Sequence, residues 1–343
     1  MSLKNNTPFI IPIFLPNLGC PHQCAFCNQT SITGVPPDTI SPETLCLLIN
    51  EFLEYKTTQR RSVQVSFYGG NFLGLKKDYI GSLLDETTKF VKNKKVDSIR
   101  FSTRPDTISG EQLGIIKDYP VSTIEIGVQS MDNRVLAMAK RGHTALDTEK
   151  AAALLKEQNY DLGMQMMVGL PGDDETKSLF TAQRIASFCP DFVRIYPTVV
   201  LSRSRLAVWY RKGKYTPWSL SRCVSLVKKL YLFFKSKEIP VIRMGLQASE
   251  DLAKDSTILA GPYHPAFGHM VHSEIFMDMA VSFLEAGRGS CDKTVINVHP
   301  RSISKMRGLK NKNVKRLKKK FQIKSLEIIP DFSLAEDKLT VVS

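Results

Sequence analysis

The sequence lacks three features that would each point to a class of protein. It contains no run of about 18 apolar residues, the length that a membrane-spanning helix requires. Residues 1–7 are mostly polar and provide no apolar signal-peptide core, so we expect a cytoplasmic protein without a membrane partner. No G-x-G-x-x-G motif follows the first apolar strand, so the usual indication of a doubly wound dinucleotide-binding sheet is missing.

Acidic residues are also scarce relative to basic ones. The chain has 33 Asp and Glu against 47 Lys and Arg, a formal net charge of +14 in 343 residues, and much of the excess lies between Lys305 and Lys320. Such a field favours polyanions, of which nucleic acid is the simplest. A solvated basic face is the alternative, and charge alone does not decide between the two.

Apolar, β-branched runs alternate with amphipathic stretches through the first 200 residues. This alternation predicts a parallel sheet with helices outside it, and about six such units predict an α/β fold, a partial (β/α)6 barrel of the TIM type. A doubly wound open sheet is the competing architecture. The predicted strands are Phe9–Leu15, Val63–Tyr68, Ser98–Thr103, Thr123–Val128, Leu162–Val168 and Phe192–Pro197.

Three regions are predicted from these patterns. Residues 1–200 form the partial barrel, 201–290 form an extension that completes it, and 291–343 form a small basic α+β module. Helices are expected to begin at Ser41 and Ser109, which are followed by helix-favouring residues, and over Thr148–Gln158. The extension is expected to contain a helical stretch over Leu206–Lys237, a strand over Pro240–Met244 and a helix over Ser273–Leu284.

Three of the seven cysteines lie close together, at Cys20, Cys24 and Cys27, directly after the first predicted strand. Sites in such barrels form where strands run into their following loops. Three thiolates can ligate three irons of a [4Fe–4S] cluster, whereas a cluster held entirely by protein uses four cysteines. The fourth iron would then be open to a chelating ligand, and the amino and carboxylate groups of S-adenosylmethionine suit it.

A structural zinc site is the main alternative use of these thiols. Zinc would need a fourth ligand, and His22 is the only nearby candidate, so we favour the cluster. Core packing is the expected role of the isolated cysteines, although a second cluster is not excluded by spacing. These are Cys46, Cys189, Cys223 and Cys291.

The motif C-x-x-x-C-x-aromatic-C, with Phe26 as the aromatic residue, resembles the signature of the radical S-adenosylmethionine (radical SAM) superfamily. Within it the chain is similar to the branch that holds the catalytic subunit of the elongator complex, a tRNA modifier, and the oxygen-independent coproporphyrinogen oxidases. The resemblance covers roughly residues 8–200, with a weaker extension to about 280. It implies reductive cleavage of S-adenosylmethionine to a 5′-deoxyadenosyl radical, with a donor such as flavodoxin or ferredoxin supplying electrons.

The resemblance also implies cofactor-binding residues at the ends of later strands. In the family, a glycine pair contacts the methionyl amine, arginines reach the carboxylate, and polar side chains bind the ribose. A plain glycine turn and an ordinary surface arginine are the alternatives for single positions. The positions that match are Phe26, Gly69, Gly70, Ser102, Thr103, Arg104, Gln129, Arg141, Gln165 and Gly169.

The chain departs from the family pattern at three points. Asn71 replaces the more usual Glu or Thr after the glycine pair, which leaves its role open. The coproporphyrinogen enzymes carry a further cysteine where this chain has Asn28, so decarboxylation of that porphyrin is disfavoured. We see no room after the barrel for the acetyltransferase domain of the elongator enzyme, so acetyl transfer is not expected.

The last 50 residues are expected to form strand, short helix, loop, basic helix and two strands. This order resembles a minimal KH module, in which a GxxG loop clamps a nucleotide backbone, and the loop here is Gly308-Leu-Lys-Asn311. Asn311 replaces the second glycine, and a solvated lysine-rich helix is the alternative. The predicted RNA contacts are Gly308, Lys310, Lys312, Lys315 and Arg316.

Three functions therefore compete. The first is a radical SAM enzyme that modifies RNA, most simply tRNA. The second is the same enzyme with a small-molecule substrate, and the third is a non-catalytic cluster protein that binds RNA. His264, His269 and His272 fit no metal-binding spacing, and a loop that caps the barrel, with Tyr263 and His264 facing substrate, is the expected use of that segment.

Overall fold

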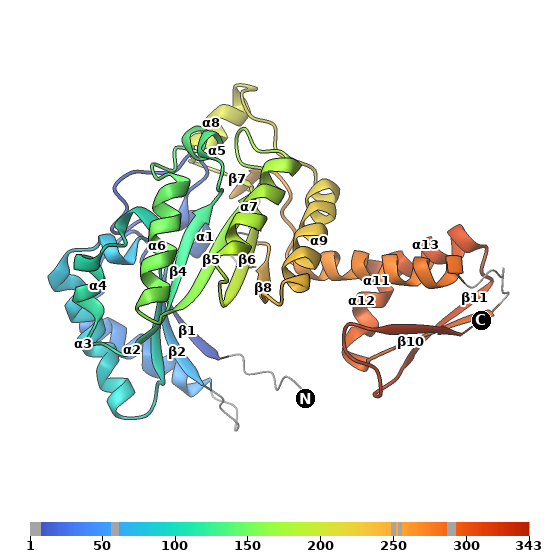
Figure 1. The fold of residues 1–343 in the computed structure, drawn as a ribbon, viewed down its shortest axis with the longest axis horizontal. Coiled ribbons are helices and arrows are strands. Elements are labelled where there is room, and N and C mark those ends of the chain that lie inside the picture. The colour runs from blue at the N-terminus through green and yellow to red at the C-terminus, as the bar shows by residue number, and fades with distance from the viewer. Residues whose placement is uncertain (1–7, 56–61, 248–251, 253–255, 287–292, 343) are drawn as a thin grey trace.

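The computed structural model describes residues 8–55, 62–247, 252, 256–286 and 293–342. Its main feature is a curled sheet of seven strands with helices along its outer side (Figure 1). The order is β1-β2-β3-β4-β5-β6-β8 and each neighbouring pair is parallel. The strands are β1 (Phe9–Phe14), β2 (Val63–Tyr68), β3 (Ser98–Thr103), β4 (Val121–Gln129), β5 (Asp161–Val168), β6 (Phe192–Pro197) and β8 (Val241–Met244).

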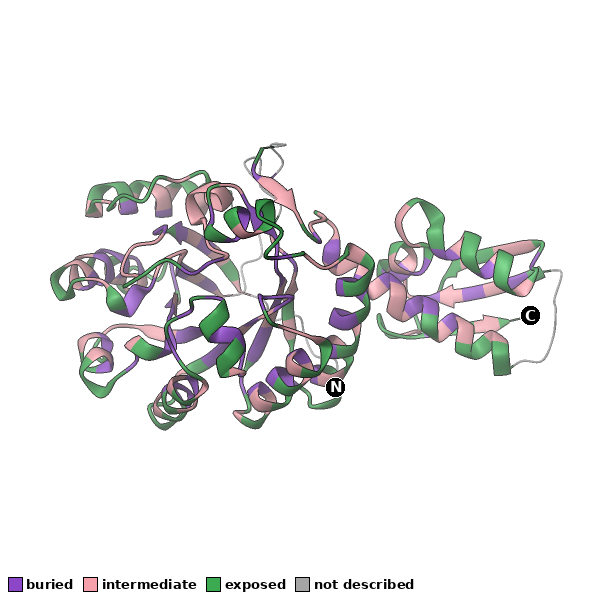
Figure 2. Ribbon diagram, turned by 90° about the horizontal axis from the view of Figure 1, so that it is seen from above, coloured by how far each residue is buried: buried purple, intermediate pink, exposed green. Residues whose placement is uncertain are grey.

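Helices follow the strands along the chain and lie around the outside of the sheet (Figure 2). The predicted partial barrel is therefore confirmed, and the strand predicted at residues 240–244 adds a seventh member to its sheet. The helices of this part are α1 (Gln29–Thr33), α2 (Pro42–Glu54), α3 (Lys77–Lys92), α4 (Gly110–Ile116), α5 (Asn133–Met138), α6 (Ala145–Glu157) and α7 (Glu175–Ser187), with short 3-10 turns η1 (Phe72–Gly74) and η2 (Pro105–Thr107).

Side-chain alternation along the strands separates an apolar outer layer from a polar interior. On β3, Ile99 and Phe101 are fully buried in the main core against the helices, while Ser102 lines the interior. Burying a side chain such as Phe101 contributes about 2 kcal/mol by removing apolar surface from water. The outer layer therefore stabilises the fold and leaves the interior free for polar groups.

Two of the helix starts, those of α2 and α4, follow the predicted caps. Ser41 and Ser109 accept backbone N–H groups of α2 and α4 with their side chains. Helix α6 begins at Ala145, three residues before the predicted start, because Thr144 and Asp147 form a capping box there. The prediction missed this cap, since it relied on the run of helix-forming residues that follows.

The helical stretch predicted over residues 206–237 is two helices, α8 (Arg205–Arg211) and α9 (Leu220–Ser236). The break contains Gly213, whose φ is +66°, and Pro217, which limits helix formation before it. A two-stranded antiparallel pair that the sequence did not predict lies nearby, made of β7 (Val200–Leu201) and β9 (Ile258–Ala260).

Helix α11 (Phe267–Ala286) connects the barrel to the C-terminal module (Figure 1). Phe267 and Val271 belong to the main core, whereas Phe276 and Met277 belong to a second core with the module. The helix starts six residues before the predicted Ser273. One continuous helix therefore anchors both cores.

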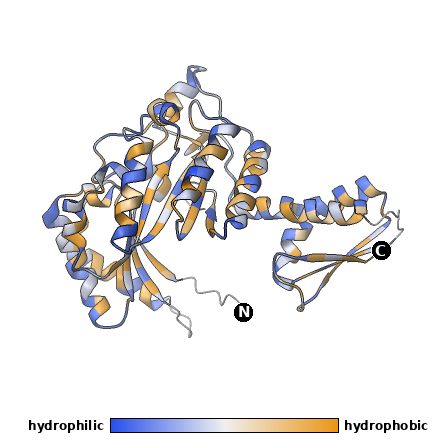
Figure 3. Cartoon of the chain, in the orientation of Figure 1, coloured by the Kyte–Doolittle hydropathy of each residue, from blue (hydrophilic) through white to orange (hydrophobic). Residues whose placement is uncertain are grey.

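The C-terminal module contains the predicted order of elements. Its sheet has the order β11-β10-β12, with β10 parallel to β11 and antiparallel to β12. The hydrophilic colouring of α13 in Figure 3 matches its run of lysines. The elements are β10 (Lys293–Val298), η3 (Pro300–Ser302), α12 (Ile303–Arg307), η4 (Leu309–Asn311), α13 (Lys312–Phe321), β11 (Ser325–Pro330) and β12 (Leu339–Val342).

A bilayer-spanning helix is not found in the described parts of the chain, since none is both long and apolar enough.

Candidate functional site

A cavity of about 920 Å³ opens among the strand ends and their loops. It brings together residues from β1 through β8 that are far apart in the sequence. Of the predicted cluster and cofactor residues, only Gly169 does not line it. Those that do are Cys20, Cys24, Phe26, Cys27, Gly69, Gly70, Ser102, Thr103, Arg104, Gln129, Arg141 and Gln165.

Backbone hydrogen bonds fix the loop that carries the three cysteines. The N–H of Ala25 donates to the carbonyl of Ala139 (2.9 Å), and the carbonyl of Ala25 accepts from the N–H of Leu206 (2.7 Å). Just before the loop, the carbonyl of Leu18 accepts from the N–H of Asn71 (2.8 Å). The loop is therefore held between the β4–α6 connection, the start of α8 and the end of β2.

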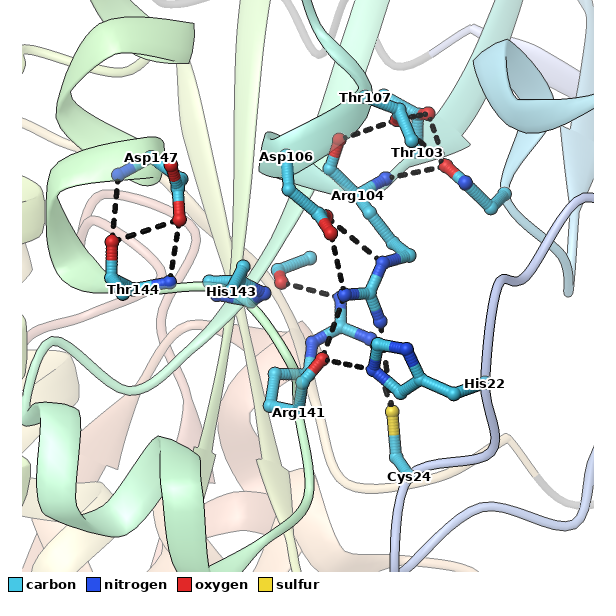
Figure 4. Close-up of polar contacts among 12 residues, drawn as sticks. His22, Cys24, Thr103, Arg104, Asp106, Thr107, Arg141, His143, Thr144 and Asp147 are labelled. Atoms are coloured by element: carbon cyan, nitrogen blue, oxygen red, sulfur yellow. Dashed lines mark hydrogen bonds and ion pairs between the residues drawn. The ribbon is translucent and has the colours of Figure 1, made fainter.

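Two arginines place positive charge beside the buried thiol of Cys24 (Figure 4). Arg141 Nη1 lies 3.3 Å from Cys24 Sγ, and Arg104 Nη1 lies 4.0 Å from it. Arg104 also makes a bidentate pair with Asp106, at 2.9 and 2.8 Å. Burial would raise the pKa of Asp106, but the hydrogen bonds and charge of Arg104 outweigh it and hold that pKa below its ordinary value. Asp106 was missed because nothing in the sequence marks it as the partner of Arg104.

His22 supports the loop through a backbone contact. Its Nε2 donates to the carbonyl of Arg141 at 2.8 Å, and its ring lies against Gly142. A Cβ on Gly142 would lie 2.0 Å from His22 Cε1, and Gly142 has a φ of +79°. With Nε2 used as a donor, only Nδ1 of this ring could bind zinc. In addition, no three His, Cys, Asp or Glu side chains among the described residues gather closely enough to hold one metal ion.

The donor set instead fits a cluster, in which each thiolate binds a different iron. All three thiols line one cavity, and the described residues do not gather them into a site for a single ion. Burial, followed by the charges of the neighbouring Cys24 and Cys20, raises the pKa of Cys27 to about 12. Burial likewise raises the pKa of Cys20. Because metal ligands must be deprotonated, binding at these thiols releases protons.

Asn71, whose role the sequence left open, joins three strand ends. It is fully buried, and its Oδ1 accepts from Thr103 Oγ1 (2.7 Å), the N–H of Arg104 (2.9 Å) and Thr107 Oγ1 (2.9 Å). Its Nδ2 donates to the carbonyl of Gly19, one residue before the first cysteine (2.9 Å). Asn71 therefore positions the cysteine loop relative to β3. The hydroxyl of Thr103 is occupied by this network.

At two strand ends, a glycine allows neighbouring groups to lie close to the backbone. A Cβ on Gly70 would lie 2.3 Å from the carbonyl oxygen of Leu18, so this position admits only glycine without movement of the loop. A Cβ on Gly127 would lie 2.8 Å from Arg141 Nη2 and 3.0 Å from Gln129 Nε2. Both glycines line the cavity, which gives them a packing role independent of any ligand.

Gln129 and Arg141 carry polar atoms that the chain does not satisfy. Gln129 has a φ of +66° at a register shift between β4 and β5, and its Oε1 is buried without a partner. Arg141 Nε is also buried without a partner, although its Nη2 donates to the carbonyl of Gly127 at 2.7 Å. Buried polar atoms without partners are costly, so these two indicate where a polar cofactor would be accepted.

Gln165 belongs to a polar network inside the barrel. Its Nε2 donates to Glu125 Oε2 (2.8 Å) and Ser102 Oγ (3.3 Å). Glu125 is fully buried and also binds Arg100 Nε (2.7 Å) and Arg194 Nε (2.9 Å). Alternating residues of the predicted strands could have revealed this network, because they share the interior face.

The turn at Gly169 lies outside the cavity lining. Its N–H donates to Asp173 Oδ2 (2.8 Å), and its carbonyl accepts from Tyr215 (2.6 Å). Burial raises the pKa of Asp173 to about 6, against the hydrogen bonds that lower it. Both backbone groups of Gly169 are therefore used within the chain.

The isolated cysteines and the three histidines named in the sequence analysis differ in burial and position. Cys223 is buried and Cys46 packs against the main core, but Cys189 is exposed, so core packing is wrong for it. It follows helix α7 with a φ of +48°, and the sequence pattern did not predict that turn. Cys291 lies outside the described residues. The histidines at 264, 269 and 272 form no metal site in the described structure, and neither Tyr263 nor His264 lines the cavity.

The predicted RNA contacts occupy the turn between α12 and α13 and the start of α13. Gly308, Lys310 and Asn311 have positive φ values, and Lys310, Lys312 and Lys315 are exposed. Arg316 pairs with Glu274 of α11. The turn is held by Asn313, whose Nδ2 donates to the carbonyl of Ser273 (2.8 Å).

Comparison with known sequences connects this geometry to a family. The sequence model of the Radical SAM superfamily matches residues 15–180, and that of the Radical_SAM C-terminal domain matches 190–276. A tRNA uridine(34) acetyltransferase of Dehalococcoides mccartyi is 25% identical over 252 residues, which are 63% of this chain and 54% of that protein. Elongator complex protein 3 of Danio rerio is 27% identical over 188 residues, covering 49% and 34% of the two chains.

The chain spans about half the length of the tRNA uridine(34) acetyltransferases that it matches, from 46% to 54%. Among solved structures, the archaeal Methanocaldococcus infernus Elp3 with an N-terminal deletion has a TM-score of 0.61 at 19% identity, covering 78% of this chain and 62% of that one. Coproporphyrinogen III oxidase from Escherichia coli has a TM-score of 0.50 at 17% identity, covering 67% and 53%. These two likenesses support the fold. The sequence matches and the fold together show that the chain belongs to the radical SAM superfamily, whose cofactors are a [4Fe–4S] cluster and S-adenosylmethionine.

Proposed function

We propose that this radical SAM enzyme modifies tRNA, with its cluster on Cys20, Cys24 and Cys27. The observation that carries the proposal is the shared cavity, which gathers the three thiols and nine of the ten predicted cofactor contacts at one edge of the sheet. The names of the matched relatives, which act on tRNA uridine, support the choice of substrate. The proposal includes a cytoplasmic location, where thiols are kept reduced.

The chain's own residues prepare the site in two ways. Arg104 and Arg141 bring positive charge to Cys24, which favours an anionic sulfur. Gln129 Oε1 and Arg141 Nε offer unsatisfied polar atoms to S-adenosylmethionine. A cluster held by Cys20, Cys24 and Cys27 would supply the electron for reductive cleavage of bound S-adenosylmethionine.

The basic C-terminal module is proposed to hold the RNA. Lys310, Lys312 and Lys315 are exposed around the turn that begins at Gly308. Phosphate contacts from such lysines position a nucleic acid without reading its sequence. A separate protein such as flavodoxin or ferredoxin would deliver the electron.

Two measurements test the proposal. After anaerobic reconstitution, the purified protein should hold a [4Fe–4S] cluster and release 5′-deoxyadenosine when reduced, and Cys24→Ala should abolish both. Cys189→Ala is the matched control, because Cys189 is exposed and does not line the cavity. Mass spectrometry of tRNA nucleosides from a strain without the gene should show a missing modification that the wild-type gene restores. If the purified protein holds a functional cluster but the strain without the gene keeps all its tRNA modifications, the small-molecule alternative would be favoured.

A further inference from the structure

The wall of the cavity formed by β6 and β8 carries a charge that the proposed chemistry does not use. Four arginines line the cavity, and no aspartate or glutamate is among the described residues that line it. Arg104 and Arg141 lie beside the cysteines, as described above. Arg194 and Arg243 lie on β6 and β8, which are at the opposite end of the strand order from β1.

Arg194 and Arg243 are direct neighbours across two parallel strands. Their Cα atoms are register partners, and both side chains reach the same cavity. Like charges placed side by side on a sheet are destabilising unless an opposite charge lies between them. The chain therefore maintains two adjacent cations in a partly buried place.

The described residues compensate only part of this charge. Arg194 donates to Glu125 Oε1 (3.1 Å) and to the hydroxyl of Tyr68 (2.9 Å). Glu125 is also the partner of Arg100, which is 5% exposed and whose Nη2 is buried without a hydrogen bond. One carboxylate thus serves two arginines, the buried Arg100 and the partly buried Arg194, and a positive charge remains.

Arg243 adds a second charge that the described residues do not compensate. Its Nη2 donates to Gln247 Oε1 at 2.9 Å, and no acidic side chain in the described part of the chain pairs with it. Gln247 is neutral and also lines the cavity. A purely structural role explains Arg194, which stabilises Glu125, but it does not explain Arg243.

We propose that Arg243 and Arg194 form a binding site for a small anionic group, a phosphate or a carboxylate, of a substrate or co-substrate. Guanidinium groups bind both anions through paired, charge-assisted hydrogen bonds. The hydroxyl of Tyr196, which lies 3.4 Å from Arg194 Nη1, provides a further polar contact on this wall. The inference rests on the proposed function, because it assigns the wall beside the cysteines to S-adenosylmethionine and leaves this wall for the second reactant.

The test measures anion binding to the reconstituted full-length protein by anaerobic calorimetry. Inorganic phosphate and succinate are the probes, and sodium chloride of equal ionic strength is the blank. The wild type should bind at least one probe beyond the blank, and the stronger probe indicates whether the natural group is a phosphate or a carboxylate. Arg243→Gln should weaken that binding at least tenfold, while Arg243→Lys should keep part of it.

Arg211→Gln is the matched control, because it removes the same charge from the exposed end of α8. Its binding should equal that of the wild type, and thermal unfolding of all variants verifies that they are folded. Equal binding by Arg243→Gln and Arg211→Gln, or no binding beyond the blank by the wild type, would overturn the inference. Binding of S-adenosylmethionine to the wild type is measured separately, so that failure of the proposed function is distinguished from failure of the anion site.

Discussion

The strand-end edge of the barrel and the C-terminal module use their polar residues in opposite ways. At the strand ends, buried polar groups bind one another, as Asn71 does with the hydroxyl of Thr103 and the backbone N–H of Arg104. In the module, Lys312 and its neighbouring lysines point to solvent. Interlocked groups define a geometry and stabilise the fold, whereas exposed charges attract a partner and add little stability. Substitutions in the two regions should therefore differ in what they damage.

The largest effect on stability is expected from Asn71→Leu. The substitution keeps the approximate size but removes the partner of four polar groups, of which the Thr103 hydroxyl and the Arg104 N–H are buried and the Gly19 carbonyl and Thr107 hydroxyl are partly buried. Each unsatisfied buried group costs about 1–3 kcal/mol, and partial relaxation reduces the sum, so we expect a loss of about 4 kcal/mol in the free energy of unfolding. Urea unfolding of the apo protein measures it.

Asn50→Leu is the control for this variant. Asn50 is partly buried on α2 and donates to Cys46 of the same helix. Its loss should cost less than about 1 kcal/mol. Similar losses for both variants would show that the strand ends are not interlocked as the structure indicates.

The module should show the opposite behaviour. Replacing all three of Lys310, Lys312 and Lys315 by glutamate should lower the affinity for tRNA about a hundredfold. The slope of log affinity against log salt concentration should become shallower by about two, because fewer phosphate contacts release fewer counterions. The free energy of unfolding should change little, since these side chains are exposed. Filter binding over a series of salt concentrations provides both values.

The matched control reverses three exposed lysines on the barrel, Lys76, Lys77 and Lys92. The change in net charge is identical, so an equal loss of tRNA affinity would mean that the module attracts RNA only through the total charge of the protein. A loss confined to the module variant would locate the RNA on it.

The junction between the two regions can be tested through pH. His272 on α11 packs edge-on against Tyr231 of α9, with Lys235, Lys305 and His269 as the charged or titratable neighbours. Burial, followed by these neighbours, lowers the pKa of His272 to about 4 from 6.5. A depressed pKa means that its contribution to stability is complete above pH 6.5 and is lost as the pH falls toward 4.

Replacing His272 with Phe should remove this dependence. We expect the wild type to lose about 2 kcal/mol more than His272→Phe between pH 7 and pH 4, after allowance for partial exposure. Denaturant unfolding at a series of pH values measures the difference. Parallel pH profiles for the two proteins would show that His272 does not titrate during acid unfolding.

Much of this architecture could be predicted from the sequence. The strands of the barrel could be predicted because their apolar runs are buried, and the predicted bounds of β2, β3 and β6 match the structure. The cysteine loop could be predicted from its spacing. The partners at the strand ends could not, because the pairing of Arg104 with Asp106 and of Asn71 with Gly19 depends on register and loop approach.

Errors occurred where local composition conflicted with tertiary packing. Helix α11 begins at Phe267, because that residue is buried in the main core, although Gly268 and the histidines after it are weak helix formers. The arginines on β6 and β8 were overlooked for a similar reason. Each occurs alone in its strand pattern, and only the parallel register brings Arg194 beside Arg243.

The smallest effect, and the sharpest test of how the cysteine loop is held, is expected from Gly142→Ala compared with Gly213→Ala. Both glycines have positive φ values, +79° and +66°, so alanine should cost about 1 kcal/mol of backbone strain in either place. Only Gly142 faces a neighbour, since the new Cβ would collide with His22, whereas Gly213 has open space around it. Gly142→Ala should therefore also lower the iron retained per chain after anaerobic reconstitution, which Gly213→Ala should not change. Equal iron in both variants would mean that the contact of His22 with this turn does not position the cysteines.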